Sequence, residues 1–170
     1  DAQQGDAGAG HDEQRVQAGV GGDGAVQHGF CDIAILRTLP GTALTAAIDE
    51  PSLLAALEFM RTYDIGLSAV RYPRDNVSDR LANLPCPPFE LGKARCLTPD
   101  LDVQAGATPD VAVLAYGTPA IDALKAADDL AGEYRVAVYD ARFAKPVDAG
   151  LIRTLLERRV PVVTVEDHSI

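Results

Sequence analysis

Two arginines, Arg71 and Arg74, flank a Tyr-Pro dipeptide in the segment SAVRYPRDN. The apolar stretch LSAVRY at 67–72 predicts a strand that Pro73 ends, because proline has no N–H to give to a sheet. Loops beyond the carboxyl ends of strands carry many ligand sites of α/β proteins, and the planar guanidinium group matches a phosphate. The pair therefore predicts a phosphate-binding site. The alternative is two solvated surface charges.

A glycine-rich segment, GVGGDGAVQHG at 19–29, allows the backbone to approach a ligand closely. His28 in this loop could transfer protons near neutral pH, or it could be an ordinary exposed or structural histidine. Asp23 lies in a Gly-Asp-Gly turn, which also begins some sites for Mg²⁺ bound to a diphosphate. Such a site needs an asparagine further along, and none occurs before Asn76. We therefore predict no metal ligand here.

The remaining reactive residue types form no recognisable pattern. The cysteines Cys31, Cys86 and Cys96 contain no CxxC pair, which favours small buried thiols in a reducing compartment over a zinc or redox site. Lys145 and Glu166 are expected to be surface charges. No Ser/His/Asp or Cys/His arrangement can be assigned from the sequence.

The first half of the chain predicts a few elements around these loops. Residues 1–16 have no apolar period and indicate a loop or tail. FCDIAILR predicts a short helix, and ALTAA at 43–47 a buried strand. Asp49 can cap a helix over about 50–61, which also has a proline in its first turn.

The last third alternates strands and helices. Aliphatic strands are predicted at 111–116, 135–140 and 161–166, with helices capped by Thr118 and Asp148 between them. This order indicates a parallel sheet with right-handed crossovers. The proline-rich stretch at about 75–109 indicates a linker, in which LGKARCL adds a short strand. We therefore expect an α/β protein with two partial or small parallel-sheet units.

Composition limits the class of partner. Hydrophobic residues make up 47% of the 170 residues and aromatic residues 5%, so the core must be built from small aliphatic side chains. The net charge of −10 argues against nucleic-acid binding. No apolar stretch reaches the ~20 residues of a membrane span, and the first residues lack a signal-peptide pattern. We expect a soluble, cytoplasmic protein.

Several segments together resemble one family. GVGGDGAVQHGFCDIAILRTLPG, AAIDEPSL and LSAVRYPRDN look like the pyrimidine-binding domain of 1-deoxy-D-xylulose 5-phosphate synthases, which are transketolase-like thiamine-diphosphate enzymes. VAVLAYGTPAIDAL, VYDARFAKPVD and VPVVTVEDHSI resemble the start of their C-terminal domain. The resemblance is collinear over about 18–170. It implies an unassigned tail at 1–16, a partial pyrimidine-binding domain at 17–92, a linker at 93–109 and a truncated C-terminal domain at 110–170.

The resemblance also implies an activity and its site. The family condenses pyruvate with glyceraldehyde 3-phosphate and releases CO₂, using thiamine diphosphate and Mg²⁺. Arg74, with Arg71 beside it, would bind the phosphate of the aldehyde, and Asp23 would lie beside the reacting centre. Gln27 stands where the family has histidine, next to His28, and a carboxamide cannot exchange protons near pH 7.

The resemblance further implies that the cofactor and metal are bound mainly by a domain absent from this chain. The chain alone would then be inactive, and the full-length protein would be a homodimer. Two alternatives stay open. One is a fragment or split subunit of a transketolase or a 2-oxoacid dehydrogenase, and the other is a non-catalytic subunit that completes a site on a partner chain.

Overall fold

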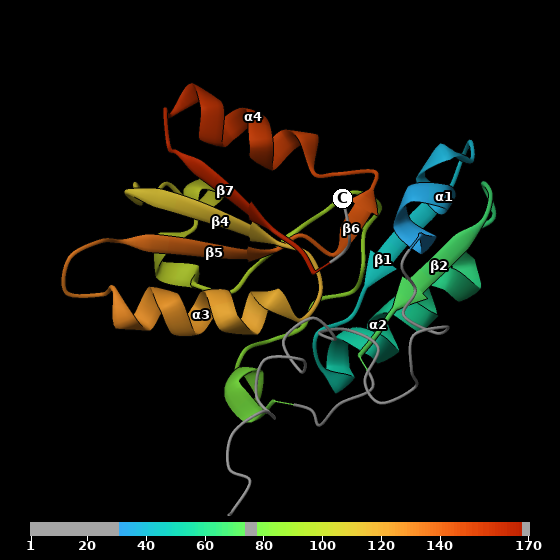
Figure 1. Cartoon of the computed structure of the whole chain (residues 1–170), viewed down its shortest axis with the longest axis horizontal. Helices are drawn as coiled ribbons and strands as arrows, with labels where there is room; N and C mark the ends of the chain where they lie inside the picture. Colours follow the sequence, from blue (N-terminus) through green and yellow to red (C-terminus); the bar gives the residue numbers. More distant parts are fainter. Residues whose placement is uncertain (1–30, 74–77, 168–170) are drawn as a thin grey trace, which may run out of the picture.

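A computed structural model describes residues 31–73 and 78–167, which form two sheets with helices packed against them (Figure 1). One sheet has three strands in the order β2-β1-β6, and the other has four strands in the order β3-β5-β4-β7. The tail at 1–16 and the glycine-rich loop lie outside the described residues. The predicted α/β class is confirmed.

The three-stranded sheet is centred on β1 (Ala43–Ala46), which is buried along its whole length. β1 pairs in parallel with β2 (Ser68–Arg71) and antiparallel with β6 (Phe143–Lys145). Alternate residues of β1 face opposite sides. Leu44 and Ala46 pack against the helix α1 (Asp32–Thr38), whereas Ala43 packs against the helix α2 (Glu50–Thr62).

Helix α2 begins where its capping residues predicted. The Asp49 carboxylate accepts the N–H of Ser52 at 2.8 Å, and the Ser52 hydroxyl accepts the N–H of Asp49 at 3.0 Å. This reciprocal pair satisfies two N–H groups that the first turn leaves without helical partners. A cap of this kind typically stabilises a helix by about 1 kcal/mol.

The four-stranded sheet carries the predicted alternation of strands and helices. β4 (Val111–Ala115) lies between β5 (Val136–Asp140) and β7 (Val162–Val165), and all three are parallel. The helices α3 and α4 cover opposite faces of this sheet (Figure 1). Helix α3 (Pro119–Asp129) buries Leu124 and Ala127, and α4 (Ala149–Glu157) buries Leu151 and Leu155.

Both sheets are mixed, because a short antiparallel strand joins each of them. β3 (Arg95–Cys96) lies in the expected linker and pairs with β5. β6 follows β5 in the sequence but leaves the four-stranded sheet and pairs with β1. The short strand predicted in LGKARCL is confirmed as β3, whereas β6 was not predicted, because three residues give no period that a sequence pattern can reveal. The division into 17–92, 93–109 and 110–170 stays a prediction.

The remaining regular structure is short. No helix within the described residues is long and apolar enough to cross a membrane. Residues 31–73 and 78–167 also contain three single-turn 3₁₀ helices: Asp79–Leu81, Pro99–Leu101 and Val103–Ala105.

Candidate functional site

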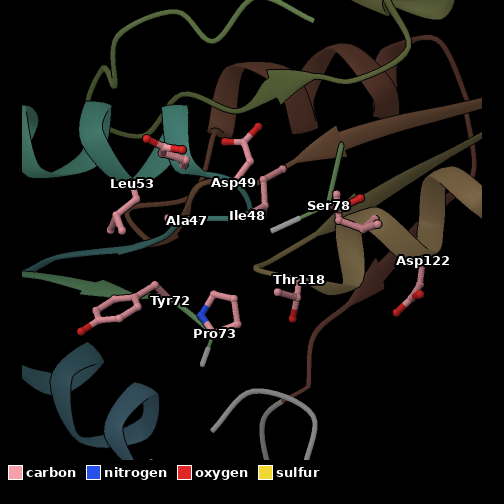
Figure 2. Close-up of a pocket in the computed structure, with 11 residues that line it drawn as sticks. Ala47, Ile48, Asp49, Leu53, Tyr72, Pro73, Ser78, Thr118 and Asp122 are labelled. Carbon is pink, nitrogen blue, oxygen red and sulfur yellow. The ribbon is translucent and has the colours of Figure 1, made fainter. Parts of the chain in front are cut away.

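A cavity of about 420 Å³ opens where the ends of several elements meet (Figure 2). Its walls come from the residues after β1 and β2, from the first turns of α2 and α3, and from Ser78. A volume of this size suits a small organic molecule. The lining residues are Ala47, Ile48, Asp49, Glu50, Leu53, Tyr72, Pro73, Ser78, Thr118, Ile121 and Asp122.

The position of the cavity follows from the parallel strands. β1 and β2 run side by side in the same direction, so the residues after their carboxyl ends emerge at the same edge of the sheet. Beside this edge, Thr118 immediately precedes α3, and its side chain makes no capping hydrogen bond, so the prediction that Thr118 caps this helix was wrong.

Arg71 faces away from the cavity. It pairs in register with Ala46, whose side chain contacts the α1 face of the sheet. There the Nε of Arg71 donates to the Oδ2 of Asp32 at 3.0 Å, and the Arg71 side chain is 19% exposed. Tyr72 and Pro73, which follow the end of β2, line the cavity instead.

The polar groups of the cavity are acidic or neutral. Asp49, Glu50 and Asp122 contribute carboxylates, and the lining includes no arginine or lysine among the described residues. Acidic side chains are favourable there because each lies at or near the positive N-terminal end of a helix. This lining does not fit a phosphate or diphosphate group.

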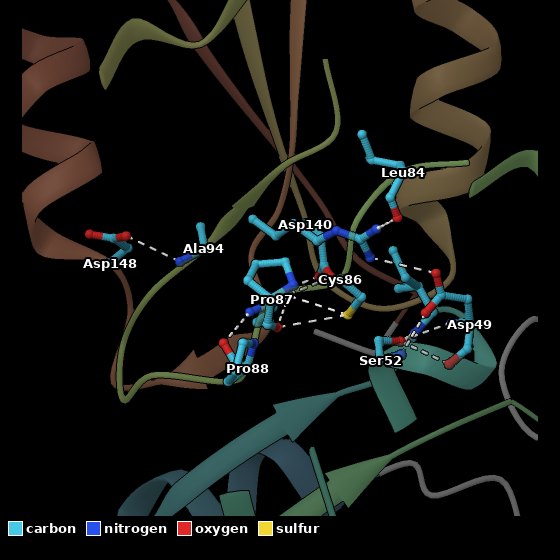
Figure 3. Close-up of polar contacts among 12 residues, drawn as sticks. Asp49, Ser52, Leu84, Cys86, Pro87, Pro88, Ala94, Asp140 and Asp148 are labelled. Carbon is cyan, nitrogen blue, oxygen red and sulfur yellow. Dashed lines mark hydrogen bonds and ion pairs between the residues drawn. The ribbon is translucent and has the colours of Figure 1, made fainter. Parts of the chain in front are cut away.

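The cavity wall connects to a buried cluster of four charged residues, Asp49, Arg95, Asp140 and Arg142 (Figure 3). Each of the four is at least 92% buried. The Nη1 of Arg95 lies 3.5 Å from the Oδ2 of Asp49, and its Nη2 donates to the carbonyl of Leu84 at 2.9 Å. The two sheets are therefore joined by charges as well as by β6.

Arg142 binds the segment that precedes β3. Its guanidinium donates to the carbonyls of Pro87 and Pro88 at 3.0 and 3.1 Å and lies 4.4 Å from the centre of the Phe89 ring. Its backbone has a positive φ of 56°, and its N–H donates to the Oδ1 of Asp140 at 2.9 Å. Residues 86–89 are thus fixed by a single buried arginine.

Burial controls the proton affinities in this region. Loss of hydration raises the pKa of Asp140 to about 7, although Arg142 and Arg95 oppose the shift. Burial lowers the pKa of Arg142, against the attraction of Asp140. Burial also raises the pKa of Tyr116 and of Tyr139 well above the usual phenol value.

Most of the predicted site residues lie outside the described residues, namely Asp23, Gln27, His28 and Arg74. Their predicted roles stay predictions, and so does the phosphate contact of Arg71. The buried cluster of charged residues was not predicted from the sequence. Its one visible signal was Asp140 and Arg142 in YDARFAKP, at the end of an aliphatic strand and just after it.

Lys145 and the three cysteines differ from expectation. The Nζ of Lys145 donates to the carbonyls of Arg37 and Leu39 at the end of α1, so it joins β6 to that helix. Cys31 is exposed, and Cys86 and Cys96 are partly exposed, so the expectation of buried thiols was wrong. Cys31 immediately precedes a short helix that buries only Ile33, which leaves the thiol near solvent.

The described residues also offer no metal site. Among them there is no group of three or more histidine, cysteine, aspartate or glutamate side chains that could hold an ion. The described residues therefore provide no ligand group for Mg²⁺, and the acidic cavity does not fit the diphosphate of thiamine diphosphate. The expectation that both are bound by another domain stays a prediction.

Residues 102–170 match the family model of the transketolase C-terminal domain. Over most of its length the chain is similar to two curated 1-deoxy-D-xylulose-5-phosphate synthases. The Listeria welshimeri protein is 34% identical over 87% of this chain, and the Thermus thermophilus protein is 39% identical over 88%. The chain spans 22% of the length of each.

A solved structure supports the same relationship. A protein titled as a split gene transketolase, an inactive β4 tetramer, superimposes with a TM-score of 0.67 and 27% identity. The match covers 83% of this chain and 44% of that one. The chain thus has the transketolase-like α/β fold and contains a region of the transketolase C-terminal type.

Proposed function

We propose that the chain is part of a 1-deoxy-D-xylulose 5-phosphate synthase, which condenses pyruvate with glyceraldehyde 3-phosphate and releases CO₂. The observation that carries this proposal is the 34–39% identity to two such synthases over 87–88% of the chain. The order of the RYPR and RFAKP segments within that span supports it as well.

The proposed roles of individual residues follow the resemblance. Arg74 binds the phosphate of the aldehyde substrate, and Asp23 lies beside the reacting centre. Gln27 holds a position where the family has histidine, so proton transfer there falls to the neighbouring His28 or is weakened. Thiamine diphosphate, which supplies the carbanion chemistry of this family, and Mg²⁺ are bound mainly outside the described residues.

We further propose that the chain alone makes no product, because it matches only 22% of the length of the synthases. The complete enzyme is taken to be a cytoplasmic homodimer. With pyruvate, glyceraldehyde 3-phosphate, thiamine diphosphate and Mg²⁺, the purified chain should give no deoxyxylulose phosphate above background. The Thermus thermophilus synthase is the positive control. Product from the chain alone contradicts this proposal.

A chimera tests the assignment itself. The matching region of the Thermus thermophilus synthase is replaced by this chain, and product formation is measured in the chimera and in its Gln27→His variant. Product from either folded protein supports the synthase. If both fold, as judged by circular dichroism, and neither makes product, the assignment is wrong.

A second candidate is a subunit of a split transketolase or 2-oxoacid dehydrogenase, or a non-catalytic subunit that completes a partner's site. The split gene transketolase favours it, because 83% of this chain superimposes on that protein. The neighbouring genes distinguish the candidates. A separate adjacent reading frame for the cofactor-binding domain supports a split enzyme, and one continuous frame supports the synthase.

A further inference from the structure

Arg95 interacts electrostatically with two carboxylates, Asp49 and Asp140, and forms an ion pair with Asp49. It stands directly opposite Asp140 in the antiparallel pairing of β3 with β5, so their side chains leave the sheet on the same face. The guanidinium nevertheless extends to Asp49, with 3.5 Å between Nη1 and Oδ2. The Nε of Arg95 is buried without a hydrogen-bond partner.

Asp140 is correspondingly under-paired. It has no exposed surface, and its Oδ1 accepts the N–H of Arg142. Its Oδ2 has no hydrogen-bond partner and lies 4.0 Å from the Nε of Arg142. The charged groups that act on it are Arg95 on β3, Asp49 at the start of α2 and Arg142 in its own loop. Two further titratable groups interact with it, Cys86 in the segment before β3 and Tyr116 after β4.

Asp49 connects Arg95 to the cavity. One of its oxygens caps α2 through Ser52, the other faces Arg95, and the residue lines the cavity. A shift of Arg95 therefore changes the charge at the cavity wall.

We propose that Asp140 is a proton-controlled switch that determines whether Arg95 pairs with Asp49 at the cavity wall or with Asp140 across β3 and β5. With a proton on Asp140, Arg95 neutralises Asp49, as in the observed arrangement. When Asp140 releases that proton, its charge has only the Nε of Arg142 at 4.0 Å and no hydrogen bond to Oδ2. A buried charge that is so poorly compensated is strongly unfavourable and favours the approach of a second cation. Arg95 then moves toward Asp140, and Asp49 becomes an unpaired carboxylate in the cavity.

The change falls in a neutral pH range, because burial raises the pKa of Asp140 to about 7. Below that pH, Asp49 caps α2 and is also paired with Arg95. Above that pH, Asp49 keeps its hydrogen bond to Ser52 and loses its ion pair with Arg95. This switch is independent of the proposed synthase activity.

The test is an NMR titration of the full chain from pH 5.5 to 8.5. The ¹³C signal of the Asp140 carboxyl should titrate with a midpoint near 7, and the amide of Ser52 should shift with the same midpoint. Asp140→Asn keeps an acceptor for the N–H of Arg142 and should abolish the shift at Ser52.

Asp148→Asn is the matched control, because Asp148 is a buried helix cap outside the cluster, with its Oδ1 accepting the N–H of Leu151. This variant should retain the titration at Ser52. A midpoint for Asp140 below 5 overturns the proposal, and so does a Ser52 shift that persists in Asp140→Asn. If Asp140→Asn does not fold, the carboxyl titration and the Ser52 midpoint in the unsubstituted chain decide the matter.

Discussion

A single buried carboxylate sets the electrostatics of the region between the sheets. Asp140 has two arginines near it, yet burial outweighs their attraction and favours its neutral form up to about pH 7. Its pKa is therefore higher in the folded chain than in the unfolded one. The stability that Asp140 contributes is fully present below its unfolded pKa of about 4 and is lost as pH rises through 7.

Because the stability contribution of Asp140 falls as pH rises, the pH dependence of the Asp140→Asn variant can be predicted. The variant cannot ionise at this position, so its free energy of unfolding lacks the decline that Asp140 causes in the unsubstituted chain. The advantage of the unsubstituted chain over the variant should shrink from pH 5 to about pH 7 and level off above it. Urea unfolding of both proteins at four pH values measures it. An advantage that grows with pH shows that Asp140 is ionised and well paired at neutral pH.

Arg74 and Arg71 allow a comparison of two neighbouring arginines. In the chimeric synthase, Arg74→Ala should weaken use of the phosphorylated aldehyde by roughly 10- to 150-fold, because a charge-assisted phosphate contact contributes ~1.5–3 kcal/mol. Use of pyruvate should change little. Arg71→Ala is the control, since Arg71 pairs with Asp32 on the α1 face. Steady-state kinetics with each substrate varied in turn measure both. If the rate of Arg74→Ala depends on the aldehyde concentration as in the unsubstituted chimera, Arg74 does not bind the phosphate.

At the scale of elements, the start of α2 combines a cap with an ion pair. Ser52→Ala removes one half of the capping box and should cost about 1 kcal/mol. Asp49→Ala also leaves Arg95 buried without its carboxylate, so a loss of about 3–5 kcal/mol is expected. Urea unfolding of both variants measures the difference.

The double variant Asp49→Ala with Arg95→Met isolates the ion pair. Removing both charges avoids the uncompensated guanidinium, so the double variant should be more stable than Asp49→Ala alone. Equal losses in Asp49→Ala and Ser52→Ala indicate that Asp49 acts only as a cap.

The elements that the sequence predicted are those with a period or a cap. The strands β4, β5 and β7 are aliphatic runs, and α2 and α4 begin at capping aspartates, so local residues sufficed. β6 was missed because three residues carry no period, and its partner β1 lies about 100 residues earlier. The charged cluster was missed for a related reason. Asp49, Arg95 and Asp140 are far apart in the sequence, and nothing local shows that a charge is buried.

At the scale of the whole molecule, side-chain contacts connect the two sheets. Phe143 on β6 is 1% exposed and packs against Ala43 of β1, Ala56 of α2 and Phe89. β6 follows β5 in the sequence, and β5 belongs to the four-stranded sheet. The Phe143 ring therefore anchors the segment that leaves the four-stranded sheet in the core of the three-stranded sheet. The charged cluster and Lys145 reinforce the same connection.

This connection predicts that the two sheets unfold together, even though the sequence analysis divides the chain at 93–109. Phe143→Ala removes a large buried ring and should cost about 3–5 kcal/mol. If the sheets form one cooperative unit, hydrogen exchange should speed up by similar factors in peptides covering β1–β2 and β4–β5. Leu156→Ala, at a position that is 66% exposed, is the control and should change neither. Faster exchange confined to β1–β2 would mean that the Phe143 ring stabilises only the sheet it packs against. The two sheets would then unfold separately, as the predicted division at 93–109 implies.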